Sequence, residues 1–387
     1  MSRPLRIAML THSTNPRGGV VHALELAEAL TALGHEVVLH APDSAGKGYF
    51  RQPSCEAVAV AVPAEVAMPG MTAMVEQRIC DYLRHFARPE ARDFDLFHAH
   101  DGISGNALAT LKERGQIGGF LRTVHHLDSF ADRRLAVLQD RSITSAAAWA
   151  SVSADGQAEL RRAYGILAPV VGNGVDRARF TPVNDGTDAA LRRRLALGEG
   201  PIFLVVGGVE ARKNTTRILE AFVQVRAVLP HAQLVIAGGA SLLDHWAYRT
   251  TFDDALGAAA LGSQAVRLVG PIPDAEMPAL YRLATTLVFA SVREGFGLCV
   301  IEAMASATPV VVSSLRPFTD YLDDNDALWC DPLRPASIAN AMLASLQPDL
   351  RKRLIANGAI VAGRHEWGDV ARRHLPLYAS LKEPVDA

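Results

Sequence analysis

The chain has 387 residues, which is long enough for two domains of ordinary size. Its formal net charge of −2 argues against a protein that binds nucleic acid through bulk positive charge. No apolar run is long enough to cross a bilayer, and the N-terminus leads into a strand-like run without the core of a signal peptide. We therefore expect a cytoplasmic protein with no nucleic-acid partner.

The first half of the chain alternates short apolar runs with helical segments, which indicates a parallel sheet with crossover helices. The clearest helix covers 20–33, where apolar residues recur at helical spacing and Gly34 follows. The region 42–75 is rich in Pro, Gly and Ala, so we expect a loop-rich insertion there. Strands are expected at 6–10, 36–40, 95–98, 121–125 and 149–152.

A second series of the same kind follows a linker at 182–201. Its strands are expected at 202–206, 233–237, 265–269, 286–290, 309–313 and 327–330. The predicted fold class is therefore α/β, with two doubly wound domains. Ligands of such sheets bind beyond the carboxyl ends of the strands, so two facing domains would form a cleft.

Glycines stand at several of the expected strand ends. Gly18 and Gly19 open the helix after the first strand, where helix amides can bind an anion, but a simple tight turn is an equally good interpretation. The full G-x-G-x-x-G fingerprint of dinucleotide-binding enzymes is absent. Further strand ends carry Gly208, Gly239 and Pro271, each an ordinary junction when taken alone.

Two cations, Arg212 and Lys213, lie at the mouth of the second sheet, just before a helix expected to begin near Thr215. Helix N-termini disfavour cations, so this pair needs a compensating reason. A bound anion such as a diphosphate supplies one.

The segment EGFGLCVIEAMASATPVVVSS places two carboxylates between two buried strands. Glu294 leaves the first strand, Gly295 and Gly297 allow a ligand to approach the backbone, and Glu302 falls one turn into a helix at 298–305. Carboxylates can hold the hydroxyl pairs of a sugar or a ribose. Glu302 can also be explained as an acid favoured by the helix dipole, whereas Glu294 has no obvious structural duty.

The residues that usually hold metals form no convincing cluster. The four cysteines are scattered without a CxxC pair, and His98 and His100 with Asp101 have no second cluster to complete a site. His125 and His126 are neighbours on a strand, so at most one of them faces a ligand. We expect no metal.

The EGFGLCVIEAMASATPVVVSS segment is similar to the E-x7-E segment of retaining glycosyltransferases of the GT-B fold, close to family 4 (glycosyltransferase group 1). Further similar segments run along nearly the whole chain, among them RTVHHLD, GGVEARKN, VIAGG and GPIPDAEMPALY. The resemblance implies two Rossmann-like domains across a cleft. It implies an acceptor-binding domain at 1–181, a nucleotide-sugar-binding domain at 182–364, and a C-terminal helix at 365–387 that crosses back to the first domain.

The resemblance also implies roles for single residues. Glu294 would hold hydroxyls of the donor sugar, and Glu302 would hold the ribose. Lys213, helped by Arg212, would neutralise the diphosphate leaving group, and His125 would lie near the reacting centre. The other donor-binding positions would be Gly18, Gly19, Gly208, Gly239, Pro271, Gly295, Phe296, Gly297 and Leu298.

Two positions depart from the family pattern. Many relatives carry an arginine where this chain has Gly208, and Arg212 is the expected replacement. Ala290 stands where a proline is usual, which we expect to be harmless.

The function implied is transfer of a sugar from a nucleoside-diphosphate sugar, UDP- or GDP-linked, to an acceptor hydroxyl with retention and without a metal or other cofactor. The acceptor could be a small molecule, a lipid or a glycan. Weak peripheral membrane association is a hypothesis resting on the Arg-rich stretches YLRHFAR and FADRRLAVLQDR, for which solvated faces are the alternative. The alternatives in function are a sugar-nucleotide oxidoreductase or epimerase, a non-catalytic nucleotide-sugar binder, and a phosphorylase-like enzyme.

Overall fold

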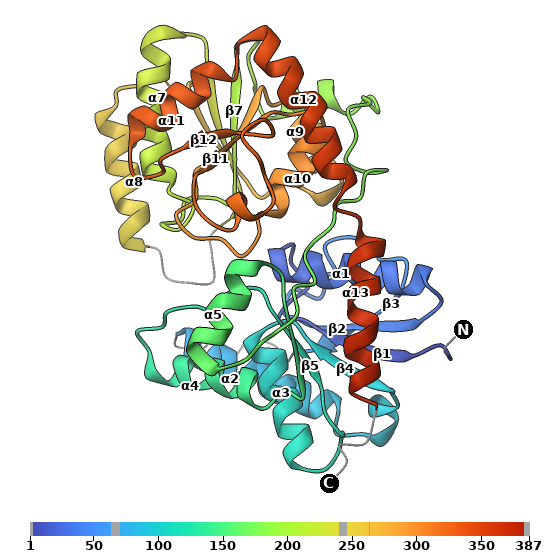
Figure 1. The fold of residues 1–387 in the computed structure, drawn as a ribbon. Helices are drawn as coiled ribbons and strands as arrows, with labels where there is room; N and C mark the ends of the chain where they lie inside the picture. Colours follow the sequence, from blue (N-terminus) through green and yellow to red (C-terminus); the bar gives the residue numbers. More distant parts are fainter. Residues whose placement is uncertain (1–2, 63–69, 240–245, 263, 383–387) are drawn as a thin grey trace. The chain divides into compact units, whose positions relative to one another are not determined.

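The computed structural model describes residues 3–62, 70–239, 246–262 and 264–382. The chain forms two compact units, of which one contains Met1–Asn173 with Trp367–Ala387 and the other contains Gly174–Glu366. The expected domain boundary at 182 therefore lies after the point where the units divide, and the C-terminal helix belongs to the first unit. Each unit holds one six-stranded sheet, and every strand pairing is parallel (Figure 1). The predicted fold class of two Rossmann-like domains is confirmed.

The sheet of the first unit has the strand order β3-β2-β1-β4-β5-β6. Its strands are β1 (Arg6–Leu10), β2 (Glu36–Asp43), β3 (Glu56–Ala61), β4 (Leu96–Ala99), β5 (Leu121–Val124) and β6 (Ala148–Ser151). Its helices are α1 (Gly18–Ala32), α2 (Met71–His85), α3 (Gly102–Glu113), α4 (Arg133–Thr144), α5 (Ala154–Tyr164) and α13 (Trp367–Ser380), with a short 3-10 turn at Pro89–Arg92.

The expectation of a loop-rich insertion at 42–75 is wrong in part. Within it β2 continues to Asp43, β3 pairs in parallel with β2, and α2 begins at Met71. β3 is an edge strand, and only Val60 of its six residues is buried. The EAVAVA run alternates with the period of a strand, but its alanines contribute little apolar surface, so the strand is hard to detect.

The sheet of the second unit has the strand order β12-β11-β10-β7-β8-β9. Its strands are β7 (Ile202–Val206), β8 (Gln233–Ala237), β9 (Val266–Gly270), β10 (Thr286–Phe289), β11 (Val310–Ser313) and β12 (Leu328–Cys330). Its helices are α6 (Asp188–Arg194), α7 (Thr215–Val228), α8 (Trp246–Ala258), α9 (Met277–Leu283), α10 (Leu298–Ala305), α11 (Pro335–Ala344) and α12 (Pro348–Gly363), with 3-10 turns at Asp274–Glu276 and Phe318–Asp320.

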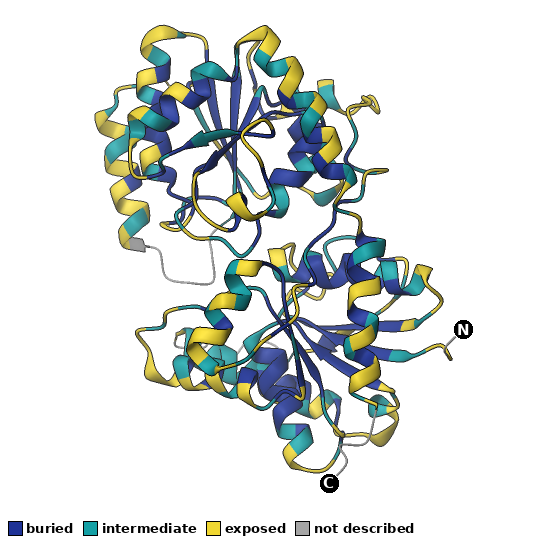
Figure 2. Ribbon diagram, viewed as in Figure 1, coloured by how far each residue is buried: buried dark blue, intermediate teal, exposed yellow. Residues whose placement is uncertain are grey.

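Consecutive residues of the central strands are buried, for example all of β8, β10 and β11. Successive side chains of a strand point to opposite faces, so both faces of the sheet are covered, as parallel sheets require. Figure 2 shows these strands as buried and the outer helix faces as exposed. Each fully buried large side chain, such as Phe203 or Phe222, contributes roughly 1.5–3 kcal/mol.

The C-terminal helix α13 packs against α1 within the first unit. Its Tyr378 is fully buried, and the Tyr378 hydroxyl lies 3.0 Å from Nδ1 of His98 on β4. Trp367 at its start contacts the ring of His22 on α1 edge-on. These contacts attach the last helix to the same unit as the first strand.

Candidate active site

The carboxyl edge of the second sheet is built from glycines that approach one another closely. Gly208 and Gly238 follow β7 and β8 with φ angles of 77° and 135°, in the region that favours glycine. A Cβ on Gly208 would lie 2.7 Å from the Gly239 carbonyl oxygen, and one on Gly239 would lie 3.1 Å from Cγ of Pro271. The sheet thus brings Gly208, Gly239 and Pro271 together at one edge.

Arg212 and Lys213 follow the same strand end, and both contact Glu294 in the loop after β10. Lys213 Nζ lies 2.5 Å and Arg212 Nη1 2.7 Å from the same oxygen, Oε1 of Glu294. Lys213 is only 7 % exposed, and its ammonium lies 4.2 Å from the centre of the Phe289 ring. The structure therefore joins three of the predicted site residues into one ionic cluster.

Gly207, directly after β7, leaves space for the side chain of Lys213. A Cβ on Gly207 would lie 2.7 Å from Cε of Lys213, and Gly207 has a φ angle of 126°. A second carboxylate, the buried Glu210, lies 3.3 Å from Nε of Arg212. The cluster therefore contains two cations and two carboxylates.

Asn214 fixes the loop that carries the two cations. It adopts a left-handed conformation with a φ angle of 60°, which asparagine tolerates better than most residues. Its Nδ2 donates to the carbonyl groups of Ala290 at 3.1 Å and Pro332 at 2.6 Å. The Val292 amide donates to the Arg212 carbonyl at 2.9 Å. The sequence analysis assigned no role to Asn214, and a left-handed conformation is unusual just before a helix, where the flanking residue is normally extended.

The start of α10 lies in the same Glu294 loop. Gly297 has a φ angle of 95°, and a Cβ there would lie 2.8 Å from the Phe318 ring. Phe296 stacks on Tyr321 with ring centres 4.6 Å apart, and the Tyr321 hydroxyl donates to the Phe296 carbonyl. Leu298 begins the helix, and the Val300 amide in its first turn donates to the Gly297 carbonyl at 2.9 Å. Backbone amides at a helix start favour an anion.

Glu302 lies one turn into α10 and is half-buried. The Tyr281 hydroxyl donates to Oε2 of Glu302 at 2.7 Å. Gly295 lies in the loop that joins Glu294 to Phe296. The predicted donor-binding residues of the second unit therefore lie around the carboxyl ends of its strands.

The remaining predicted site residues belong to the first unit. Gly18 and Gly19 begin α1, and a Cβ on Gly19 would lie 3.1 Å from Cδ2 of His125. Glycine thus allows the His125 imidazole to pack against the start of the helix. His125 Nε2 lies 3.3 Å from Nδ1 of His100, whereas His126 is exposed and lies beside Asp128.

Two relatives found by sequence match nearly the whole chain. A D-inositol 3-phosphate glycosyltransferase of Xylanimonas cellulosilytica is 31% identical over 423 residues, covering 98% of this chain and 97% of the relative. The phosphatidyl-myo-inositol mannosyltransferase of Propionibacterium freudenreichii subsp. shermanii is 28% identical, covering 94% and 91%. The family described as Glycosyltransferase Family 4 matches 16–179, and that described as Glycosyl transferases group 1 matches 188–360.

The chain belongs to the group 1, family 4 glycosyltransferases. The resemblance inferred from its motifs is confirmed, and the protein is a glycosyltransferase. Two solved structures have the same fold. Anabaena HepE has a TM-score of 0.79 at 17% identity and covers 97% of this chain and 100% of its own. Sucrose-phosphate synthase of Thermosynechococcus elongatus has a TM-score of 0.77 at 23% identity, with 97% and 98% covered.

This glycosyltransferase has a group of histidines at the carboxyl ends of β4 and β5. His98 uses both ring nitrogens, toward Tyr378 and Thr123. Asp101 caps α3 by accepting from the Ser104 amide at 2.8 Å, so its sequence position next to His100 reflects a helix start. Among the described residues, no group of three or more His, Cys, Asp or Glu side chains is arranged to hold a metal ion.

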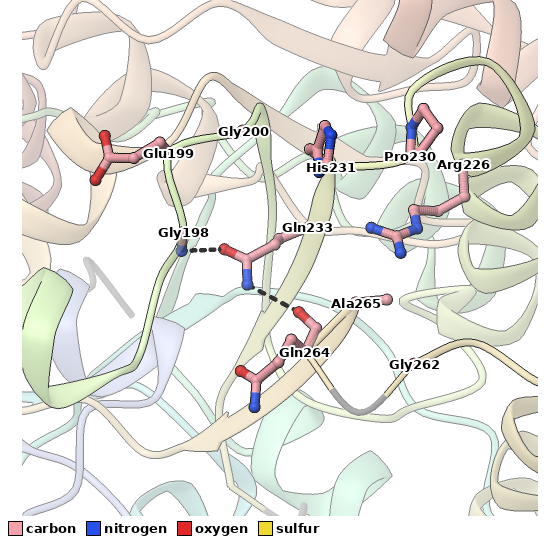
Figure 3. A pocket seen from close by; sticks show the side chains of 10 residues that line it. All are labelled: Gly198, Glu199, Gly200, Arg226, Pro230, His231, Gln233, Gly262, Gln264 and Ala265. Carbon is pink, nitrogen blue, oxygen red and sulfur yellow. Dashed lines mark hydrogen bonds between the residues drawn. The ribbon is translucent and has the colours of Figure 1, made fainter.

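A hollow of about 480 Å³ lies at the opposite, amino-terminal edge of the second sheet (Figure 3). Gln233 lines it; its Oε1 accepts from the Gly198 N–H at 2.6 Å, and its Nε2 donates to the Gln264 carbonyl at 2.8 Å. Ligands of doubly wound sheets bind at the carboxyl ends of the strands. We therefore place the candidate site of the enzyme at that edge of the second sheet and not in this hollow.

In the described part of the chain, no helix combines the length and apolar character needed to span a bilayer.

Proposed function

We propose that this glycosyltransferase moves a sugar from a UDP- or GDP-sugar to an acceptor hydroxyl, with retention of anomeric configuration and without a divalent metal. The observation that carries the proposal is the contact of Lys213 and Arg212 with one oxygen of Glu294. Two cations converge on an anionic atom at the edge of the sheet where ligands bind. A diphosphate offers the same cations more oxygens than a single carboxylate does.

In the proposed reaction the diphosphate replaces Glu294 at the cations. Lys213 and Arg212, with the first amides of α10, then stabilise the charge that develops on the leaving phosphate. Glu294 is released to accept hydrogen bonds from hydroxyls of the donor sugar. The anomeric carbon loses its phosphate oxygen and gains the acceptor oxygen on the same face, while the acceptor proton passes to the leaving phosphate.

The donor class is supported by the relatives. The HepE structure was solved with UDP-glucose, and the Propionibacterium relative is named a mannosyltransferase. Both sequence relatives have names with an inositol acceptor, so inositol phosphates and phosphatidylinositol are the first acceptors to assay. The roles of Gly18, Gly19 and His125 in the first unit stay predictions from the resemblance.

Peripheral membrane association also stays a prediction. In the stretch YLRHFAR, Arg84 pairs with Asp81. In the stretch FADRRLAVLQDR, Arg134 pairs with Glu76 and Arg141 pairs with Glu113. This pairing favours solvated faces as the explanation of those arginines. A flotation assay with anionic liposomes tests the point, since membrane association predicts co-floating protein.

A thermal-shift panel tests the proposed function. It contains UDP, GDP, ADP, their sugar conjugates, NAD and NADP, each with magnesium or with EDTA. A ligand at a hundredfold its Kd adds about 2.7 kcal/mol, which moves the midpoint by several degrees. We expect a shift with one nucleoside diphosphate that EDTA leaves unchanged. A shift with NAD or NADP alone would favour the oxidoreductase, and binding without turnover would favour the non-catalytic binder.

Product analysis completes the test. Proton NMR of the reaction in EDTA should show a product with the anomeric configuration of the donor. An inverted product, or a strict requirement for magnesium, would contradict the proposal. Activity with a sugar phosphate and no nucleotide would favour the phosphorylase-like alternative.

A further inference from the structure

Tyr281 is a fully buried tyrosine on α9, and its hydroxyl is directed at a carboxylate of the candidate site. Its side chain is 0 % exposed, and its ring contacts Phe180 edge-on at 5.8 Å. Its carbonyl accepts from the Thr308 hydroxyl at 2.7 Å. The ring and the backbone of Tyr281 are therefore both held in place, and together they fix the position of its hydroxyl group.

The Tyr281 hydroxyl contacts the carboxylate of Glu302. The Tyr281 hydroxyl donates to Oε2 of Glu302 at 2.7 Å, from α9 to α10. Cys299, three residues earlier on the same helix, lies beside the same hydroxyl. Glu302 is half-buried, and the terminal torsion of a glutamate has no sharp preference, so its neighbours, Tyr281 among them, set the orientation of its carboxylate plane.

The hydroxyl of Tyr281 is suited to this task throughout the neutral range. Burial raises the pKa of Tyr281 well above its usual value, and the nearby Cys299 and Glu302 raise it further. The group therefore remains a donor. A carboxylate oxygen can accept two hydrogen bonds, so the bond from Tyr281 leaves Oε2 able to accept another.

We propose that Tyr281 is a positioning residue that orients the Glu302 carboxylate toward the ribose hydroxyls of the donor, and thereby sets the preference for ribonucleotides over deoxyribonucleotides. This inference rests on the proposed function, in which Glu302 holds the ribose. Tyr281 acts through Glu302 and does not touch the donor. A merely structural tyrosine would join α9 to α10 and would have no effect on this preference.

The test compares the Kd of UDP or GDP, whichever binds, with that of its 2′-deoxy analogue, by calorimetry. The variants are Tyr281→Phe, Glu302→Gln and the matched control Tyr164→Phe. Tyr164 also donates to a carboxylate at 2.7 Å, that of Asp140, but it lies in the first unit. Phenylalanine keeps the ring of residue 281 and the carbonyl that Thr308 contacts, so we expect this variant to fold.

We expect Tyr281→Phe to weaken ribonucleotide binding about tenfold, as for a lost hydrogen bond to a charged group, and to leave the deoxyribonucleotide nearly unaffected. Glu302→Gln should reduce the preference in the same way, and Tyr164→Phe should not change it. In steady-state kinetics, Tyr281→Phe should raise the KM of the donor more than it lowers kcat.

A Tyr281→Phe protein with a lowered Tm but an unchanged preference overturns the inference and leaves the proposed function intact. Failure of the wild-type protein to bind any nucleoside diphosphate overturns the proposed function itself. Should Tyr281→Phe not fold, Glu302→Asp takes its place, because it withdraws the carboxylate from Tyr281 by one methylene. An unchanged preference in Glu302→Asp shows that no support is needed and overturns the inference.

Discussion

Lys213 Nζ lies 2.5 Å from Oε1 of Glu294, and both side chains are more than nine-tenths buried. A buried ion pair adds little net stability, because the desolvation of both charges offsets their attraction. The two residues are 81 positions apart and lie at the ends of β7 and β10. We therefore interpret the pair as a functional arrangement, in which Glu294 remains paired with the two cations until an anionic ligand replaces it.

Replacement of Lys213 by methionine should impair catalysis far more than folding. Methionine keeps much of the apolar stem, and Arg212 still contacts Glu294, so the loss of unfolding free energy should stay below about 2 kcal/mol. Loss of one preorganised positive group should lower kcat by about a hundredfold. Urea unfolding and initial rates measure the two effects. A large loss of stability with unchanged kcat would contradict the assignment.

Asn214 should be needed for the stability of the protein. Asn214→Ala removes the donor to two buried carbonyl groups and leaves a strained backbone, so we expect a loss of about 2–3 kcal/mol. Asn214→Gly is the matched control, since it loses the hydrogen bonds but relieves the strain, and it should cost less. Urea unfolding gives the order of stabilities, and equal costs would argue against backbone strain.

Gly208 should not accept a side chain. Its φ angle is 77°, and a Cβ added there would lie 2.7 Å from the Gly239 carbonyl oxygen, so we expect Gly208→Ala to lose about 2 kcal/mol or more. Gly18→Ala is the control, because a Cβ there would meet nothing within 4 Å. Thermal unfolding of the two variants tests the prediction: Gly208→Ala should have the lower Tm, and similar Tm values would contradict it.

The first unit should lose stability in mild acid. Burial lowers the pKa of His22 to about 4 and of His374 to about 3, and it holds the pKa values of His98, His100 and His125 well below their usual range. Their folded pKa values lie below the unfolded value near 6.5, so the unfolded chain binds more protons as the pH falls below 6.5.

Each of these histidines then costs up to about 1.4 kcal/mol per pH unit, between pH 6.5 and its folded pKa. We expect amide exchange in the first unit to accelerate steeply from pH 6.5 to 5, after correction for intrinsic rates. The second unit is the internal reference. Equal acid sensitivity of the two units would contradict a special role for this group of histidines.

Much of the fold can be predicted because the parallel strands are buried on both faces and therefore appear as continuous apolar runs. The expected strand at 202–206 coincides with β7, and the expected helix at 298–305 coincides with α10. β3 could not be identified in the same way, because a largely exposed edge strand in which half of the residues are alanine lacks that signal.

The candidate site could be predicted only in its residue types. The sequence indicates Glu294 and Lys213, whose charges follow strand ends, and Glu302, which falls one turn into the helix after Glu294. It does not reveal that Glu294 pairs with Lys213, or that Tyr281 supports Glu302, because both contacts join distant segments through the topology of the sheet. The left-handed conformation of Asn214 likewise depends on carbonyl groups from two other loops.

The most direct test of the central claim is a calorimetric titration of the wild type, Lys213→Met and Glu294→Gln with UDP and GDP in EDTA. If Glu294 holds the cations that receive the diphosphate, removing its charge should tighten binding of the free nucleotide about tenfold, although transfer is lost. Lys213→Met should weaken the same binding. Weaker binding in Glu294→Gln, or unchanged binding in Lys213→Met, would contradict the account.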